Sequence, residues 1–215
     1  GNIFTSDRYM SNEIPLPEDR DNVLRLVKGD RWMNKSRTSE AITTPDKSEF
    51  MCHIQNLSMS PTRRMKSLCD NKGNEISLIR RMHNGFETIY QICCFKPLYD
   101  NQQPLGFQHD GKDVYEWAEA REKAGSYFEF IMKLANGQSY QSKMSWGSFS
   151  VLELTREGRT CATLNPTIPP MPVGCLSDAI NEHNWDLTIS PGNDTCLIIC
   201  FITVIKDILE DIKNI

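Results

Sequence analysis

The chain has 215 residues, of which 39 % are hydrophobic and 24 % charged, and its formal net charge at pH 7 is −4. These values fit one large domain with a tail, or two small domains, and they exclude global disorder. An acidic chain also lacks the cationic surface that general nucleic-acid binding requires, so nucleic acid is not an expected partner.

The N-terminus begins Gly-Asn-Ile-Phe-Thr-Ser. If an initiator methionine precedes Gly1, this segment satisfies the pattern for N-myristoylation; the alternative is a glycine left by removal of a purification tag. Residues 1–20 contain no apolar stretch that could serve as a signal-peptide core. We therefore predict an intracellular, cytoplasmic protein that is peripheral at the cytoplasmic face of a membrane if Gly1 is acylated.

Residues 1–46 are predicted to form a largely irregular N-terminal arm, because charges, prolines and a Ser/Thr-rich stretch alternate there with weak periodicity. Within the arm, residues 22–27 fit either a short strand or a helical turn. We expect a protein partner, or the domain itself, to hold the arm in place.

The eight cysteines are interpreted as reduced and mostly buried. Cys93 and Cys94 are adjacent, which is too tight for ordinary disulfide geometry. The chain has no CxxC pair, and Cys52-His53 has no second pair at ligand spacing, so we predict no metal site and no cofactor.

Three hairpins are predicted in the body of the chain, which implies an antiparallel sheet or barrel. Their strands and turns are 65–69 and 75–82 around Gly73, 126–134 and 138–144 around Asn136-Gly137, and 148–155 and 159–164 around 156–158. Residues 89–95 and 106–108 are predicted as further strands. Residues 114–123 fit a strand at their start and a helix by composition, and residues 165–172, with four prolines, fit only an extended loop.

The C-terminal segment predicts a strand at 185–189, a Pro191-Gly192 turn and a helix at about 194–209, capped by Asp194. Ten apolar residues span only about 15 Å, roughly half a bilayer core, so protein must enclose this helix. We predict a closed β-barrel around one central helix. The predicted core residues of the helix are Cys196, Leu197, Ile198, Ile199, Cys200, Phe201, Ile202, Val204 and Ile205.

This segment resembles the closing strand, turn and helix of LURP-one-related proteins, whose fold is shared with the Tubby C-terminal domain and the phospholipid scramblases. Leu68–Arg81 is similar to the family's first clear hairpin and Val114–Trp117 to another strand, so the likeness covers about residues 48–213. It implies that residues 47–215 form a mainly β, Tubby C-terminal-like barrel. The chain lacks an acidic calcium loop of the scramblase type, and the scramblase cysteine cluster is reduced to Cys93-Cys94, which argues against lipid scrambling.

The chain is predicted not to be an enzyme, because it has no Gly-x-Ser-x-Gly elbow, no HExxH pair and no phosphate-binding glycine loop. Its four histidines are interpreted as surface residues. The carboxylates Asp110 and Asp113 are interpreted as part of a solvated face.

One group of cations predicts a ligand site. Arg63, Arg64 and Lys66 precede the first turn and Arg80 and Arg81 follow it, so the hairpin would bring all five to the same end. Such a cluster would bind an anionic lipid, a phosphoinositide or an acidic partner. The alternative is an ordinary charged rim neutralised by carboxylates.

The sequence thus favours a non-enzymatic binding or scaffold protein, associated with a membrane surface through an acylated Gly1 and anionic lipids. One alternative is a constitutive subunit of a larger assembly whose N-terminal arm wraps a neighbour. The other is a scramblase-like lipid-handling protein.

Overall fold

The computed structural model describes residues 22–28, 38–46, 49–58, 64–84, 87–126, 128–145, 151–166 and 185–213. These residues form fourteen strands and one helix, labelled α2. The strands are β1 (Asn22–Lys28), β2 (Thr38–Thr43), β3 (Phe50–Ser58), β4 (Met65–Asp70), β5 (Glu75–Asn84), β6 (Glu87–Cys94), β7 (Gln108–His109), β8 (Lys112–Asp113), β9 (Tyr115–Glu122), β10 (Glu129–Leu134), β11 (Ser139–Ser145), β12 (Val151–Arg156), β13 (Arg159–Pro166) and β14 (Trp185–Ile189).

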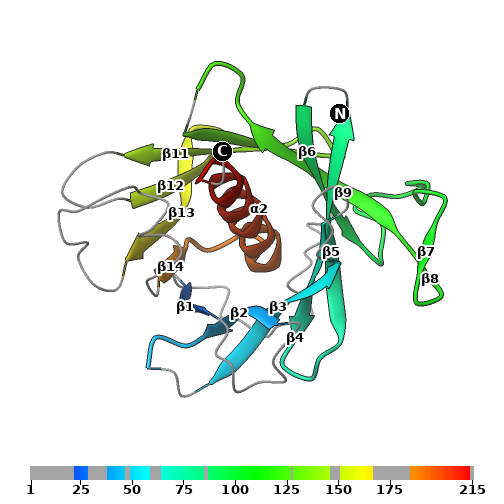
Figure 1. The fold of residues 1–215 in the computed structure, drawn as a ribbon, viewed down its shortest axis with the longest axis horizontal. Coiled ribbons are helices and arrows are strands. Elements are labelled where there is room, and N and C mark those ends of the chain that lie inside the picture. Colours follow the sequence, from blue (N-terminus) through cyan, green and yellow to red (C-terminus); the bar gives the residue numbers. More distant parts are fainter. Residues whose placement is uncertain are drawn as a thin grey trace.

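Twelve of these strands close into one antiparallel barrel in the order β1-β14-β13-β12-β11-β10-β9-β6-β5-β4-β3-β2. Most neighbours in the ring are also neighbours along the chain. The exceptions are β9, which pairs with β6 because β7 and β8 form a separate two-stranded sheet outside the ring, and β14, which closes the ring against β1. Figure 1 shows the ring of strands around α2. The predicted closed barrel around one C-terminal helix is confirmed.

All three predicted hairpins are present, as β4–β5, β10–β11 and β12–β13. The β10–β11 turn needs a left-handed residue, which Gly137 supplies with a φ of 91°. In the β4–β5 turn, the Asp70 carboxylate accepts hydrogen bonds of 2.8 Å from the backbone N–H groups of Lys72 and Asn74. Turn chemistry therefore sets the register of these strands.

Residues 114–123, which the sequence left between strand and helix, form strand β9 over Tyr115–Glu122. The strand pairs with β6 on one side and β10 on the other, so tertiary pairing overrides the helical preference of its Ala and Glu residues. Ala118 and Ala120 are fully buried in the main core. Their small side chains leave room for the helix, which approaches β9 and β6 most closely.

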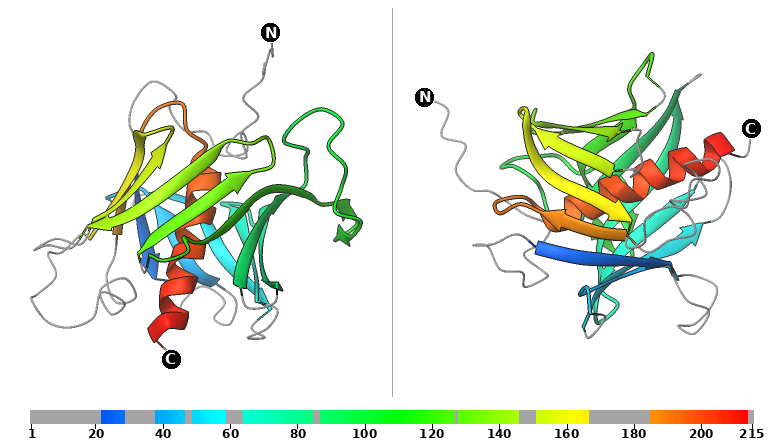
Figure 2. Two further views of the ribbon diagram at one scale, coloured as in Figure 1. Left: turned by 90° about the horizontal axis from the view of Figure 1, so that it is seen from above. Right: turned by 90° about the vertical axis from the view of Figure 1, so that its left-hand side faces the viewer.

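The helix α2 spans Thr195–Lys213 and runs through the barrel (Figure 2). Its cap is as predicted: the backbone N–H of Leu197 donates to the Asp194 Oδ1 at 3.1 Å. The nine predicted core residues are all at most 2 % exposed. The helix continues four residues past the predicted end at 209. No helix among the described residues has the length and apolar run needed to cross a membrane.

The predicted boundary between an arm at 1–46 and a barrel from 47 is wrong for two segments. Strands β1 and β2 belong to the barrel, and β1 pairs with both β14 and β2. Leu24, Leu26 and Ile42 are at most 2 % exposed because they alternate with outward-facing residues along these strands. Gly1 and the rest of residues 1–21 lie outside the described residues.

Residues 95–114 form an excursion that packs on the outer face of the barrel. Leu78, Cys93 and Val114 make a second, small apolar cluster there, against Phe95 and Phe107 among others. The strand predicted at 106–108 is only the two-residue β7, Gln108–His109, at the tip of the excursion. This packing holds the β7–β8 hairpin beside the barrel (Figure 1).

Candidate functional site

Three of the five predicted anion-binding cations meet at one end of the barrel, against the last turns of α2. The Lys66 Nζ lies 2.5 Å from Asp207 Oδ1, and Arg64 reaches Asp207 at 3.9 Å and Asp211 at 3.4 Å. The Arg81 Nη1 lies 2.9 Å from Asp211 Oδ2. We call these five residues the rim network. It joins β4 and β5 to the helix.

A fourth predicted cation, Arg80, is not part of this network. Adjacent residues of a strand point to opposite faces, so Arg80 lies outside the barrel while Arg81 lies inside. The Arg80 guanidinium carbon is 4.3 Å from the centre of the Phe107 ring, and its Nη1 donates to Gln91 Oε1 at 3.1 Å. Arg63 lies outside the described residues. Side-chain alternation along β5 thus separates Arg80 from Arg81.

The rim network is largely shielded from water. The Asp207 side chain is 4 % exposed and that of Lys66 13 %. Burial raises the pKa of Asp207, and the neighbouring charges of Lys66 and Arg64 oppose that rise. Cations at the C-terminal end of a helix also face the negative end of its dipole. The network is therefore a structural link between helix and barrel, reinforced by an ion pair between Lys206 and Glu40 of β2.

Replacing Lys66 by Met is expected to lower the free energy of unfolding by about 3 kcal/mol, the cost of removing one partner of a buried ion pair. Methionine preserves most of the side-chain length, so the loss reports the missing charge beside Asp207. Urea denaturation at pH 7 measures it. In the double variant Lys66→Met/Asp207→Leu the Asp207 carboxylate is gone, so part of the loss should be recovered. A double variant no more stable than Lys66→Met would contradict this.

The described cysteines offer no activated nucleophile. The thiols of Cys52, Cys69, Cys93, Cys94, Cys161, Cys196 and Cys200 are all free and buried. Burial raises the pKa of Cys93 and of Cys200 to about 12, whereas a reactive thiol needs a lowered pKa. The Cys200 Sγ lies 3.1 Å from the Ser77 hydroxyl inside the barrel. These thiols act as small apolar core residues.

Stability is expected to fall as the pH rises above about 8.5, where free thiols begin to ionise in the unfolded chain. The folded-state pKa of Cys200 is raised to about 12, so its contribution is fully present below the unfolded pKa and is lost between the two values. Urea denaturation between pH 8 and about pH 10.5 checks this. The Cys200→Ala variant should lose less stability over that range than the parent chain, and an equal loss would contradict the prediction.

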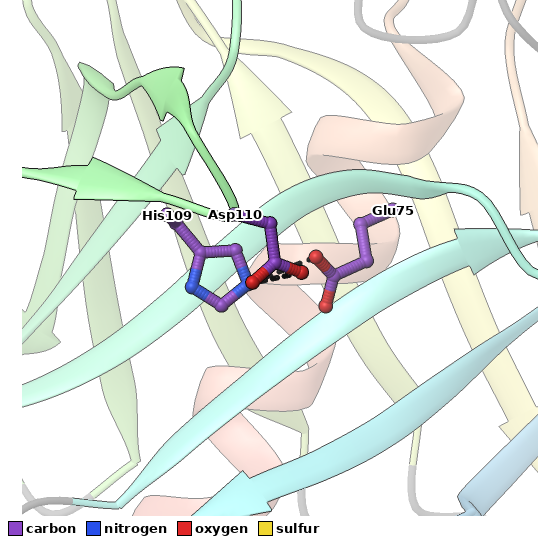
Figure 3. A group of neighbouring side chains, drawn as sticks. All are labelled: Glu75, His109 and Asp110. Atoms are coloured by element: carbon purple, nitrogen blue, oxygen red, sulfur yellow. Dashed lines mark hydrogen bonds and ion pairs between the residues drawn. The ribbon is translucent and has the colours of Figure 1, made fainter.

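A second cluster joins the β7–β8 hairpin to the barrel. The His109 Nε2 lies 2.9 Å from Glu75 Oε2, at the start of β5, and 4.0 Å from Asp110 Oδ2 (Figure 3). One donor atom from each of the three side chains lies within 4.8 Å of the others. The His109 ring stacks on Phe95, with ring centroids 6.1 Å apart and an interplanar angle of 20°.

Sequence reasoning missed this cluster, because it treated His109 as a lone surface histidine and Asp110 as part of a solvated face. The local signal was the Asp110-Gly111 pair, which is typical of a two-residue hairpin turn; both residues have positive φ, 50° and 74°. That turn places His109 and Asp110 together. Glu75 is 34 residues from His109 in sequence, so the contact between them could not be predicted from the local sequence.

Searches of protein-family models, curated proteins and solved structures found no match to this chain. The resemblance to LURP-one-related and Tubby-like proteins therefore stays a prediction.

Proposed function

We propose that this chain is a non-enzymatic binding or scaffold protein in which barrel and helix form one rigid body and partners bind the outer surface. The observation that carries the proposal is the position of α2. Every residue from Asp194 to Ile205 is buried, so the chain's own helix occupies the barrel axis. A barrel filled in this way meets its ligands from outside.

The polar groups along the helix support the proposal, because they are used internally. The Thr203 hydroxyl donates to the Ile199 carbonyl at 2.9 Å, and Ser77 is engaged with Cys200. A nucleophilic enzyme needs a side chain that is exposed to substrate and has a base beside it. The buried thiols, with their raised pKa values, have the opposite properties.

An anionic lipid headgroup at the rim network would compete with two carboxylates that are already in place. Asp207 and Asp211 take up the charges of Lys66, Arg64 and Arg81. For this reason the proposal does not depend on the rim as the binding surface. Membrane attachment through an acylated Gly1 would be a separate contribution to function. Gly1 itself lies outside the described residues.

In the alternative function, the chain is a subunit whose N-terminal arm wraps a neighbour. Two segments of that arm belong to the barrel and are not available for wrapping. Strands β1 and β2 are hydrogen-bonded into the barrel between β14 and β3. They could reach a neighbouring chain only by opening the ring and exposing Leu24, Leu26 and Ile42. Partner binding is therefore proposed for the surface of the closed barrel.

Size-exclusion chromatography of the native extract, with lysine cross-linking and mass spectrometry, tests the proposal. The chain is expected to elute well above its own 24.7 kDa and to cross-link to a partner through exposed lysines such as Lys72, Lys133 and Lys143. A parallel flotation with vesicles of neutral or acidic phospholipid identifies a membrane partner. Elution as a lone monomer together with no flotation on either vesicle would overturn the proposal.

A further inference from the structure

We propose that Glu75, His109 and Asp110 form a binding site for a divalent cation of the zinc type, which fastens the β7–β8 hairpin to the barrel. The site goes beyond the proposed function and does not depend on it. Within the described part of the chain, these three side chains bring their donor atoms close enough together to hold a metal ion.

The donor atoms are spaced as a small coordination sphere requires. Zinc bonds to imidazole nitrogen and carboxylate oxygen are about 2.0–2.2 Å long, so neighbouring ligands of a tetrahedral ion lie about 3.3 Å apart. The His109 Nε2 is 2.9 Å from Glu75 Oε2 and 4.0 Å from Asp110 Oδ2, which brackets that separation. An ion would take the place of the present hydrogen bond between His109 and Glu75.

The charges of the cluster also favour a cation. Among the described residues, both carboxylates have the same ion-pair partner, His109, and one imidazole carries at most a single positive charge. Two carboxylates and a neutral imidazole carry a charge of −2, which one divalent ion balances. An imidazole ligand favours zinc and similar transition metals over calcium or magnesium.

The surroundings hold two of the three ligands, Glu75 and His109, close to the barrel before an ion arrives. The Phe95 ring stacks on the imidazole, and the tight Asp110-Gly111 turn sets the backbone from which Asp110 projects. Glu75 and His109 side chains are 17 % and 19 % exposed, whereas Asp110 is 82 % exposed. An ion can thus enter from the Asp110 side, and the open fourth position would hold water.

Isothermal titration of the whole chain with zinc chloride, after treatment with EDTA, tests the site. One ion per chain is expected. The variants Glu75→Gln, His109→Gln and Asp110→Asn should each weaken binding by more than about tenfold, the loss that even outer-shell partners of a metal cause. Asparagine tolerates the positive φ of Asp110, so that variant preserves the turn.

Matched controls are His83→Gln and Asp113→Asn, which change another described histidine and another carboxylate of the same hairpin; both should bind zinc like the parent chain. Thermal melts in EDTA establish that each variant folds. Zinc should also slow hydrogen exchange at residues 108–113 in the parent chain and not in His109→Gln. Absence of zinc binding by the parent chain, or equal binding by the three site variants, would overturn the proposal.

Discussion

Leu24→Asp is expected to abolish the folded state or to remove most of its stability, although Leu24 lies in a segment with the composition of an irregular arm. The side chain is 2 % exposed and faces the helix side of β1. Burying an unpaired carboxylate costs many kcal/mol, against a total stability of about 5–15 kcal/mol for a typical domain. Far-UV circular dichroism and urea denaturation at pH 7 measure the loss.

The neighbouring substitution Val23→Asp is the matched control. Val23 is 41 % exposed, on the outer face of the same strand, so the same change should cost about 1 kcal/mol or less. If both variants unfold, or if both fold like the parent chain, the alternation assigned to β1 is wrong.

Phe201→Ala is expected to lower the free energy of unfolding by about 3–5 kcal/mol, through lost burial and the cavity that remains. Phe201 is fully buried in the middle of α2 and is one of the largest enclosed side chains of the chain. Because the helix is surrounded by strands, no nearby segment can collapse freely into the space. Urea denaturation measures the change.

Glu210→Ala provides the control on the same helix. Glu210 is exposed, and alanine is a strong helix former, so this variant should lose far less stability than Phe201→Ala, about 1 kcal/mol or less. A loss at Phe201 no larger than that at Glu210 would contradict enclosure of the helix.

The helix and the hairpins were predictable because their signals are local. An apolar run that is capped by Asp194 and followed by charged residues predicts that α2 is a helix and that protein surrounds it. The Asn136-Gly137 turn likewise predicts that the two strands beside it pair with each other. In each case the residues that decide the structure lie within one element or one turn.

The pairing of β1 with β14 was not predictable for the opposite reason. Strand β1 pairs with β14, and Arg25 donates to Asp186 across 161 residues of sequence. Charged residues and prolines are scattered through residues 1–46, and they obscure the short alternation around Leu24. Closure of the ring supplies the second partner of β1.

The candidate sites were predictable only in part. The prediction placed the five cations at one end of a hairpin. It did not consider the side-chain alternation that separates Arg80 from Arg81, or the carboxylates on the last turns of α2. The Glu75–His109 contact depends on the path of the whole excursion between β6 and β9. Such contacts follow from the tertiary fold and have no local signature.

Native-state hydrogen exchange of α2, followed residue by residue by NMR, tests most directly whether the barrel encloses its own C-terminal helix. Amides from Ile198 to Ile205 should exchange only through global unfolding, with an opening free energy equal to that from urea denaturation. Exchange of these amides at the rate of a solvent-exposed helix, while the strands remain protected, would contradict the enclosed helix and the filled barrel.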